Sequence, residues 1–338
     1  MRAVTYRGPG ELRVESIPDP IPAPGEVLLT VAAAGICGTD RHIVAGELDV
    51  APGTVPGHEI AGRVAQLGED VDGWSIGARV VSYGQVTCGR CGPCLDGNEH
   101  RCRRPEVLGM TRQGGFAEMV AVPQQCLIAV PDLVPDEIGA IVPDAIATPY
   151  HALITVGRIG AGETVVIIGA GGLGLQAIAV ARMADAKRIV AVDPSADARE
   201  AALIVGADAV LDPTAGENPA KALYDLTGGA TLGLEAVGRA DSVELGMQSL
   251  APGGRLVIVG VGQDRPRLPP LIRFVAGETS IHGSFGSTMA EIRTVLDLIA
   301  ADKLDVSHAI SRRVPLDDVP AVFKRPATPG RTVTLPEL

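Results

Sequence analysis

The feature that most constrains the fold of this chain is an alternation of apolar and helix-like segments that begins near residue 163. The apolar segments are TVVIIG, RIVAVD, ADAVLD, TLGLEAV and RLVIVGV, and stretches such as LGLQAIAVARMA and DAREAALIVGA lie between them. Continuous Val and Ile runs are typical of parallel strands that helices cover on both faces. This part of the chain is therefore predicted to form a doubly wound, parallel α/β domain.

A glycine motif follows the first of these strands and precedes the first helix. Its spacing is G-x-G-x-x-G, in which the first glycine makes a tight turn, the second lets the backbone approach a pyrophosphate and the third lets the helix pack closely. The helix N-terminus then faces the phosphates of a dinucleotide. The loop predicted to bind them consists of Gly169, Gly171, Gly172, Leu173 and Gly174. A glycine turn without a ligand is the alternative.

Asp193 ends the next strand and indicates which dinucleotide binds. A carboxylate at this place accepts hydrogen bonds from the ribose hydroxyls of NAD and repels the 2′-phosphate of NADP. Arg199, shortly after it, is the feature that favours NADP. We expect NAD to be the cofactor.

The first part of the chain has a different pattern, which changes near residue 150. Short apolar segments separated by turns are typical of an all-β barrel or sandwich. They are RAVTY, ELRVESI, EVLLTVAAAGIC, IAGRVAQLG, ARVVS and FAEMVAVP. After about residue 285 come a helical segment, MAEIRTVLDLIAADK, and a final strand, GRTVTL. The 338 residues thus predict two domains, one mostly β and one α/β.

Charge and hydropathy exclude several kinds of partner. The net charge is −11, which disfavours nucleic acid and anionic lipid. Glycines interrupt the longest apolar region, residues 165–181, and it is too short for a membrane span. The first residues carry Arg7, Gly8 and Pro9 where a signal peptide needs an apolar run. We therefore expect a cytoplasmic protein.

Four of the six cysteines lie in one glycine-rich stretch with the spacing C-x2-C-x2-C-x7-C. In a reducing compartment such a cluster favours metal over disulfides. Four thiolates complete a zinc tetrahedron and leave no position for substrate, so the predicted site is structural. Free or redox-active thiols are the alternative. The four predicted ligands are Cys88, Cys91, Cys94 and Cys102.

The order of several motifs along the chain resembles one family, the zinc-dependent medium-chain alcohol and polyol dehydrogenases. The motifs are C-G-T-D-x-H (37–42), G-H-E (57–59), the cysteine lobe (88–102), G-x-G-x-x-G (169–174) and G-R (330–331). The resemblance implies a GroES-like catalytic domain formed by residues 1–145 and 286–338. It also implies a Rossmann domain, residues 146–285, inserted between these two segments.

The resemblance further implies a second, catalytic zinc ion bound by Cys37, His58 and a third ligand. In the segment VPDAIATPYHAL the matching residue is Asp144, where many alcohol dehydrogenases carry Cys and the polyol and sugar branches carry an acid. Glu59 is expected beside the metal, where it can replace water. The alternative is that Asp144 only caps the following helix, while water and Glu59 complete the coordination.

Other residues match family positions around the reaction. Thr39 is expected to accept the proton of the alcohol, and His42 to pass it to solvent. Asp40 is expected to orient the zinc histidine. Thr148 matches a residue near the nicotinamide, and Arg331 matches a contact to the pyrophosphate. Two alternatives stay open, because Thr148 also suits a helix cap and His42 also suits an ordinary surface position.

Together these features predict an NAD- and zinc-dependent enzyme that transfers a hydride between a primary or secondary alcohol and NAD. The small-molecule partner is an alcohol or its carbonyl product. A polyol or sugar dehydrogenase of the same family is the close alternative. An NAD-binding sensor without catalysis and a zinc-independent quinone reductase are disfavoured by the ligand-type residues present. The family also implies a homodimer or homotetramer.

Overall fold

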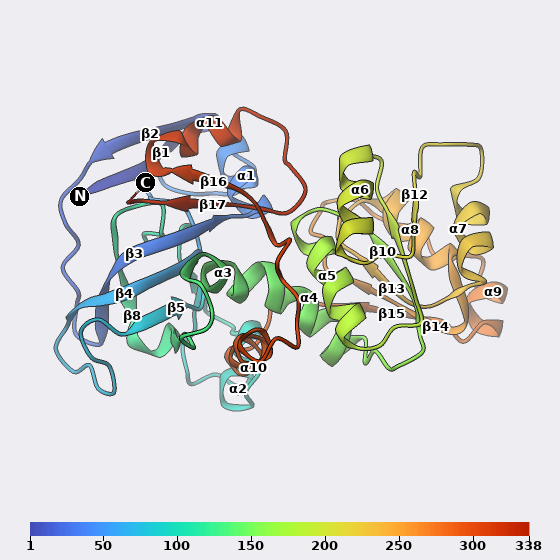
Figure 1. Ribbon diagram of the computed structural model, residues 1–338, viewed down its shortest axis with the longest axis horizontal. Helices are drawn as coiled ribbons and strands as arrows, with labels where there is room; N and C mark the ends of the chain where they lie inside the picture. The colour runs from blue at the N-terminus through green and yellow to red at the C-terminus, as the bar shows by residue number, and fades with distance from the viewer. Residues whose placement is uncertain (338) are drawn as a thin grey trace. The chain divides into compact units, whose positions relative to one another are not determined.

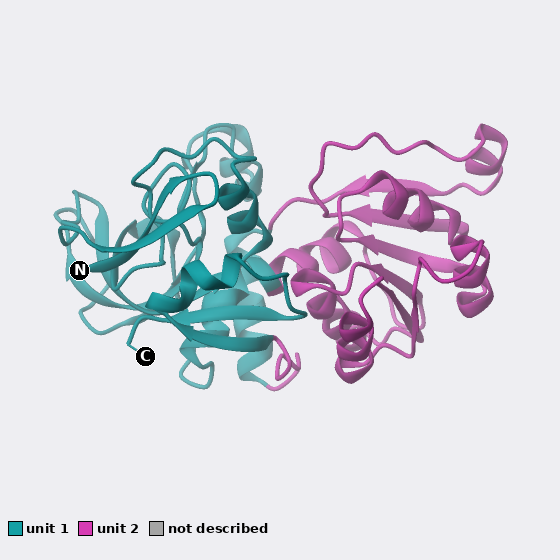
Figure 2. Ribbon diagram, turned by 90° about the horizontal axis from the view of Figure 1, so that it is seen from above, with its two compact units in different colours: residues 1–145, 287–301, 310–338 teal, residues 146–286, 302–309 magenta. Residues whose placement is uncertain are grey.

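The computed structural model describes residues 1–337 and divides the chain into two compact units (Figures 1 and 2). Unit 1 comprises residues 1–145, 287–301 and the segment from 310 onward, and unit 2 comprises residues 146–286 and 302–309. The sequence analysis placed residue 286 and residues 302–309 in the catalytic domain. The structure groups them with unit 2, because most of their backbone neighbours belong to that unit.

Unit 2 is built on a six-stranded parallel sheet (Figure 1). Its strands are β10 (Thr164–Ile168), β11 (Arg188–Val192), β12 (Ala209–Leu211), β13 (Ala230–Glu235), β14 (Leu250–Ile258) and β15 (Ser280–Gly283). In space they follow the order β12-β11-β10-β13-β14-β15, which is the order 3-2-1-4-5-6 of a Rossmann sheet. The predicted doubly wound fold is therefore confirmed.

The helices of unit 2 alternate with these strands. They are α4 (Ala147–Tyr150), α5 (Gly172–Met183), α6 (Ala196–Val205), α7 (Pro219–Thr227), α8 (Ala240–Gln248) and α9 (Leu271–Ala276). In the central strand β10 the exposed fraction of residues 165–168 is 3% or less. Such burial is possible because the strand has no polar side chain there, as the Val and Ile run predicted.

Unit 1 contains a mixed seven-stranded sheet with the order β16-β17-β3-β4-β5-β9, in which β8 also pairs with β3 (Figure 1). Its strands are β3 (Glu26–Ile36), β4 (Glu59–Leu67), β5 (Arg79–Ser82), β8 (Met119–Pro123), β9 (Leu127–Ala129), β16 (Ile310–Pro315) and β17 (Arg331–Leu335). Two smaller pairs join β1 (Arg2–Gly8) to β2 (Glu11–Ser16) and β6 (Gln85–Val86) to β7 (Glu106–Val107). This mostly-β unit matches the predicted GroES-like domain.

The helices of unit 1 are α1 (Gly38–Ala45), α2 (Gly92–Leu95), α3 (Asp136–Ile141), α10 (Met289–Ala300) and α11 (Val319–Phe323). Beyond α3 the chain forms a wider, π-helical turn, Val142–Ile146, and a second one, His151–Val156, lies beyond α4. Such turns in a helical segment often occur at functional sites. The first one carries Asp144. Within residues 1–337, no helix is long and apolar enough to cross a bilayer.

Candidate active site

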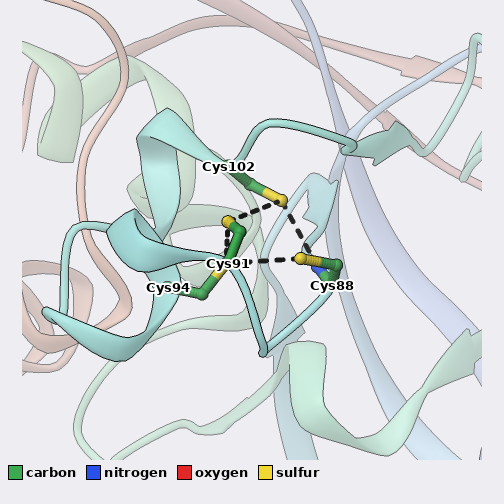
Figure 3. A group of neighbouring side chains, drawn as sticks. All are labelled: Cys88, Cys91, Cys94 and Cys102. Atoms are coloured by element: carbon green, nitrogen blue, oxygen red, sulfur yellow. Dashed lines mark hydrogen bonds between the residues drawn. The ribbon is translucent and has the colours of Figure 1, made fainter.

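The four cysteines of the predicted structural site converge in unit 1, as Figure 3 shows. The Sγ of Cys91 lies 3.4 Å from the Sγ of Cys94 and 4.0 Å from the Sγ of Cys102. The Sγ atoms of Cys88 and Cys94 are 4.0 Å apart. A zinc ion with Zn–S bonds of about 2.3 Å places its four sulfurs about 3.8 Å from one another. The donor set and its spacing therefore fit a closed zinc tetrahedron.

Backbone amides contribute to this cluster. The N–H groups of Cys88 and Arg104 donate to the Sγ of Cys102 over 3.4 and 3.5 Å. Hydrogen bonds from backbone N–H groups of Arg103 and Cys94 lower the pKa of Cys91 to about 6. Burial, with the neighbouring thiols, raises the pKa of Cys94 to about 12. The loop thus stabilises some thiolates by itself, and a cation is needed for the complete set.

A second group of potential ligands in unit 1 comprises Cys37, His58, Glu59 and Asp144, whose ligand atoms all lie within 4.8 Å of one another. The Oδ2 of Asp144 is 3.1 Å from the Sγ of Cys37 and 3.8 Å from the Nε2 of His58. One sulfur, one imidazole nitrogen and one carboxylate oxygen therefore face a common point. This donor set fits a zinc site with an open fourth position.

Strand pairing explains why residues distant in sequence meet here. In the antiparallel register Gly35 pairs with Glu59, and Thr332 pairs with Ile36. The last residues of β3 therefore lie next to the first residues of β4 and β17. Cys37 follows β3 directly, whereas Glu59 begins β4 and Arg331 begins β17, so all three lie at the same end of these strands.

Arg331 lies among the predicted metal ligands. Its Nη2 is 2.6 Å from the Oε1 of Glu59 and 3.0 Å from the Oδ2 of Asp144. Its side chain is 6% exposed. The sequence analysis assigned Arg331 to the pyrophosphate of the cofactor and missed its contacts with the two carboxylates. The pyrophosphate contact stays a prediction.

Asp40 lies behind the ligands. Its Oδ2 accepts a hydrogen bond from the backbone N–H of Cys37 over 2.8 Å, and its Oδ1 is 3.6 Å from the Nδ1 of His58. Asp40 is fully buried. The carboxylate therefore lies where it can orient the ring of His58, with the Nε2 directed toward Asp144.

Mutual interactions shift the pKa values of the whole group. Burial lowers the pKa of His58, but the carboxylates of Asp40 and Asp144 outweigh it and hold that pKa well above its usual value. Burial raises the pKa of Glu59 to about 8 although Arg331 opposes it. The pKa of Asp144 falls well below its usual value despite burial, because His58 and Arg331 stabilise the carboxylate. Burial and Asp144 raise the pKa of Cys37. Such perturbed groups are typical of functional sites.

The two residues of the predicted proton path are in α1. The Oγ1 of Thr39 lies 3.8 Å from the Sγ of Cys37, so its hydroxyl is next to the ligand group. His42 lies one helical turn further, about half exposed, with its Nδ1 2.5 Å from the Oε2 of Glu47. The sequence analysis did not identify Glu47 as a partner of His42.

In unit 2 the glycine loop has the geometry that the motif predicts. Gly169 has a φ of +91°, and a Cβ on Gly174 would lie 1.8 Å from the carbonyl oxygen of Gly169. Next to Gly171, at the N-cap of α5, there is open space, and no side chain caps the helix. Gly172 and Leu173 begin α5. The free backbone N–H groups of this helix start fit a pyrophosphate.

Asp193 directly follows β11 and bonds to the same loop. Its Oδ2 accepts the N–H of Ala170 over 2.9 Å, and its Oδ1 accepts the N–H of Ser195 over 2.8 Å. Arg199 is held by the backbone carbonyl of Asp193 and by the carboxylate of Asp212, 3.1 Å away. The acid is thus fixed at the carboxyl edge of the sheet, where dinucleotide riboses bind.

Thr148 and Glu235 are two further buried polar residues of unit 2. Thr148 is buried in α4. Glu235, which ends β13, was missed, although an acid in an apolar strand segment is a usable signal. It is fully buried, and its Oε1 accepts hydrogen bonds from the N–H groups of Val237 and Gly238 and from the hydroxyl of Ser242. It stabilises the loop after β13.

Family models match segments of both units. Residues 23–132 match the family of alcohol dehydrogenase GroES-like domains, and residues 172–301 match the family of zinc-binding dehydrogenases. An L-threonine 3-dehydrogenase of Pyrococcus horikoshii is 35% identical over 305 residues, which cover 87% of this chain and 85% of that protein.

Solved structures extend the likeness to nearly the whole chain. The alcohol dehydrogenase TADH from Thermus sp. ATN1 has a TM-score of 0.91 at 31% identity, with 99% of each chain covered. A structure from Sinorhizobium meliloti 1021 bound to NADP has the same TM-score at 32% identity, again with 99% of each chain covered. With its two groups of potential zinc ligands, its glycine loop and these matches, the chain belongs to the zinc-dependent medium-chain dehydrogenase family.

Proposed function

We propose that this dehydrogenase oxidises an alcohol to a ketone or aldehyde and transfers the hydride to NAD. The observation that carries the proposal is the convergence of Cys37, His58 and Asp144 on one point, with the hydroxyl of Thr39 3.8 Å from the thiol sulfur. A zinc ion bound by these three residues supplies Lewis acidity that lowers the pKa of an alcohol.

The residues of the chain have separate tasks in this reaction. Asp40 orients His58, while Thr39 accepts the proton of the alcohol and His42 passes it to solvent. The hydride leaves the carbinol carbon for the nicotinamide, so the alcohol loses two electrons and NAD gains them. Glu47, whose Oε2 lies 2.5 Å from the Nδ1 of His42, orients the imidazole ring for this step.

For the substrate, the likeness to an L-threonine 3-dehydrogenase supports a secondary alcohol. The acid at Asp144 supports the second candidate, a polyol or sugar. A carboxylate is a harder donor than a thiolate and leaves the metal a stronger Lewis acid. It thereby favours a second oxygen ligand from a diol.

For the cofactor, Asp193 supports NAD. Arg199 is already bonded to Asp212 and to backbone carbonyls, so it is less available for a 2′-phosphate. The likeness to a structure bound to NADP makes direct comparison of the two cofactors essential. The cytoplasmic location, the homo-oligomer and the small-molecule partner remain proposals that rest on the family and the acidic composition.

The decisive experiment is an assay of primary alcohols, secondary alcohols, polyols and L-threonine, each with NAD and with NADP. We expect turnover of secondary alcohols with NAD. Thr39→Val, which removes the hydroxyl but keeps the shape, should lower kcat by about 10²-fold or more. Thr39→Ser is the matched control and should retain most activity. His42→Ala should lower kcat less than Thr39→Val, because water can take over the late proton transfer from His42. If no alcohol is oxidised with either cofactor, the proposed function is wrong.

A further inference from the structure

The contacts of Arg331 point to a role at the catalytic metal site itself. Its Nη2 touches both Glu59 and Asp144, and its guanidinium is almost completely buried. A buried cation held by two carboxylates normally balances charge that would otherwise be costly. The Oδ2 of Asp144 that Arg331 contacts is the same atom that faces Cys37 and His58.

The charges of the site show what Arg331 balances. A bound divalent ion favours the ionised forms of its neighbours, and Cys37, Glu59 and Asp144 then carry three negative charges together, which leaves the group with one negative charge in excess. Arg331 supplies the missing positive charge. Without it, Glu59 would be a buried carboxylate whose nearest available cation is the metal, so it would be drawn to the metal as a further ligand.

The sheet provides a place for Glu59 away from that position. Gly35 pairs with Glu59 across the strands, and a Cβ on Gly35 would lie 1.8 Å from the Oε2 of Glu59. The carboxylate therefore occupies space that only glycine leaves free on β3. Its Oε1 is bonded to Arg331, and its Oε2 is buried with no hydrogen-bond partner within residues 1–337. Two independent features thus act on the same carboxylate.

We propose that Arg331, together with the space at Gly35, holds Glu59 off the catalytic metal and so keeps the fourth coordination position open for substrate. In this role Arg331 is a positioning residue that determines the number of protein ligands. With Arg331 in place the metal has three protein ligands. Without it, Glu59 joins Cys37, His58 and Asp144, and the site closes like the cysteine cluster. The inference rests on the catalytic metal of the proposed function.

The test uses protein whose catalytic site is loaded with Co²⁺, which reports its ligands through its visible spectrum. Azide serves as the probe of an open position. The unaltered protein should change its spectrum when azide is added. Arg331→Met should bind Co²⁺ at least about tenfold more tightly in competition with a chelator, because a nearby positive charge is lost. It should also lose the response to azide, because Glu59 fills the open position.

Two matched variants isolate the cause. Glu59→Gln added to Arg331→Met should restore the azide response, because the amide is a poor metal ligand, whereas Glu59→Gln alone should leave it unchanged. Arg331→Lys keeps the charge and should respond like the unaltered protein. If Arg331→Met still binds azide, or if its cobalt affinity does not rise, the inference is wrong.

Two measurements keep the inference testable if Arg331→Met does not fold. Gly35→Ala leaves Arg331 in place but takes the space of Glu59, and it should weaken the azide response. Cobalt-edge X-ray absorption of the unaltered protein, loaded with Co²⁺ at the catalytic site, should show three protein donors, and four would refute the inference. None of these readouts needs turnover. A chain that behaves as expected toward Co²⁺ but oxidises no alcohol would refute the proposed function alone.

Discussion

Replacement of Asp193 tests the cofactor assignment most sharply, and the structure sets the size of the effect. Each carboxylate oxygen of Asp193 already accepts one backbone N–H, from Ala170 or from Ser195. A carboxylate oxygen accepts about two hydrogen bonds, so one acceptor position remains on each oxygen. These two positions suit the two hydroxyls of an adenosine ribose.

A hydrogen bond to a charged group contributes about 1.5–3 kcal/mol. The two ribose bonds share one carboxylate and replace water, so we take the value of a single bond for the pair. Asp193→Ala should therefore weaken NAD binding by about 10- to 150-fold. Binding of NADP should be weakened less or improved, because the repulsion of its phosphate is lost as well.

The assay is calorimetric binding of both cofactors, with kcat/KM for the best alcohol as a second readout. Asp197→Ala is the matched control, since this exposed carboxylate lies in the first turn of the following helix. It should change neither cofactor much. An equal change for NAD and NADP in Asp193→Ala, or an unaltered enzyme that prefers NADP, would contradict the reasoning.

Three further predictions concern metal content and stability. Cys94→Ser should reduce the zinc content from two ions per chain to one and lower Tm, because zinc at a closed site contributes folding free energy. Asp144→Ala should also leave one ion per chain by metal analysis, and the remaining ion should be the one in the cysteine cluster. Arg255→Met should lower the free energy of unfolding by about 1–3 kcal/mol in urea, because Arg255 bonds to both carboxylate oxygens of Glu163 over 2.8 Å. Burial raises the pKa of Glu163, but the hydrogen bonds and charge of Arg255 outweigh burial, so the pKa is lowered overall. The stabilisation is therefore present above the unfolded pKa of about 4.3 and is lost as the pH falls below it. A difference between the two proteins that grows at low pH would contradict this assignment.

Local sequence patterns were sufficient for much of the fold. The apolar segments TVVIIG, RIVAVD, ADAVLD, TLGLEAV and RLVIVGV predicted β10, β11, β12, β13 and β14, and the glycine spacing predicted the turn before α5. These patterns are informative because periodicity and backbone angles depend on neighbouring residues. The short edge strand β15 and several helices of both units were not located, because their segments lack a clear period.

The two candidate metal sites differ in how far local sequence predicted them. The convergence of the four cysteines was expected from their spacing alone, since 15 residues of loop contain all of them. The candidate ligands Cys37, His58 and Asp144 came from a family resemblance, because no local pattern connects three separate segments. The structure brings these three together.

The environment of Glu59 was decided only by the tertiary structure. Arg331 is 272 residues away in sequence, and the two residues meet because β17 and β4 both pair with β3 in a particular register. A shift of one residue in either pairing would turn these side chains to the other face of the sheet. The sequence by itself determined which residue types were available for metal, cofactor and proton transfer. Strand register determined which buried charges lie against one another, because it depends on the packing of the whole sheet.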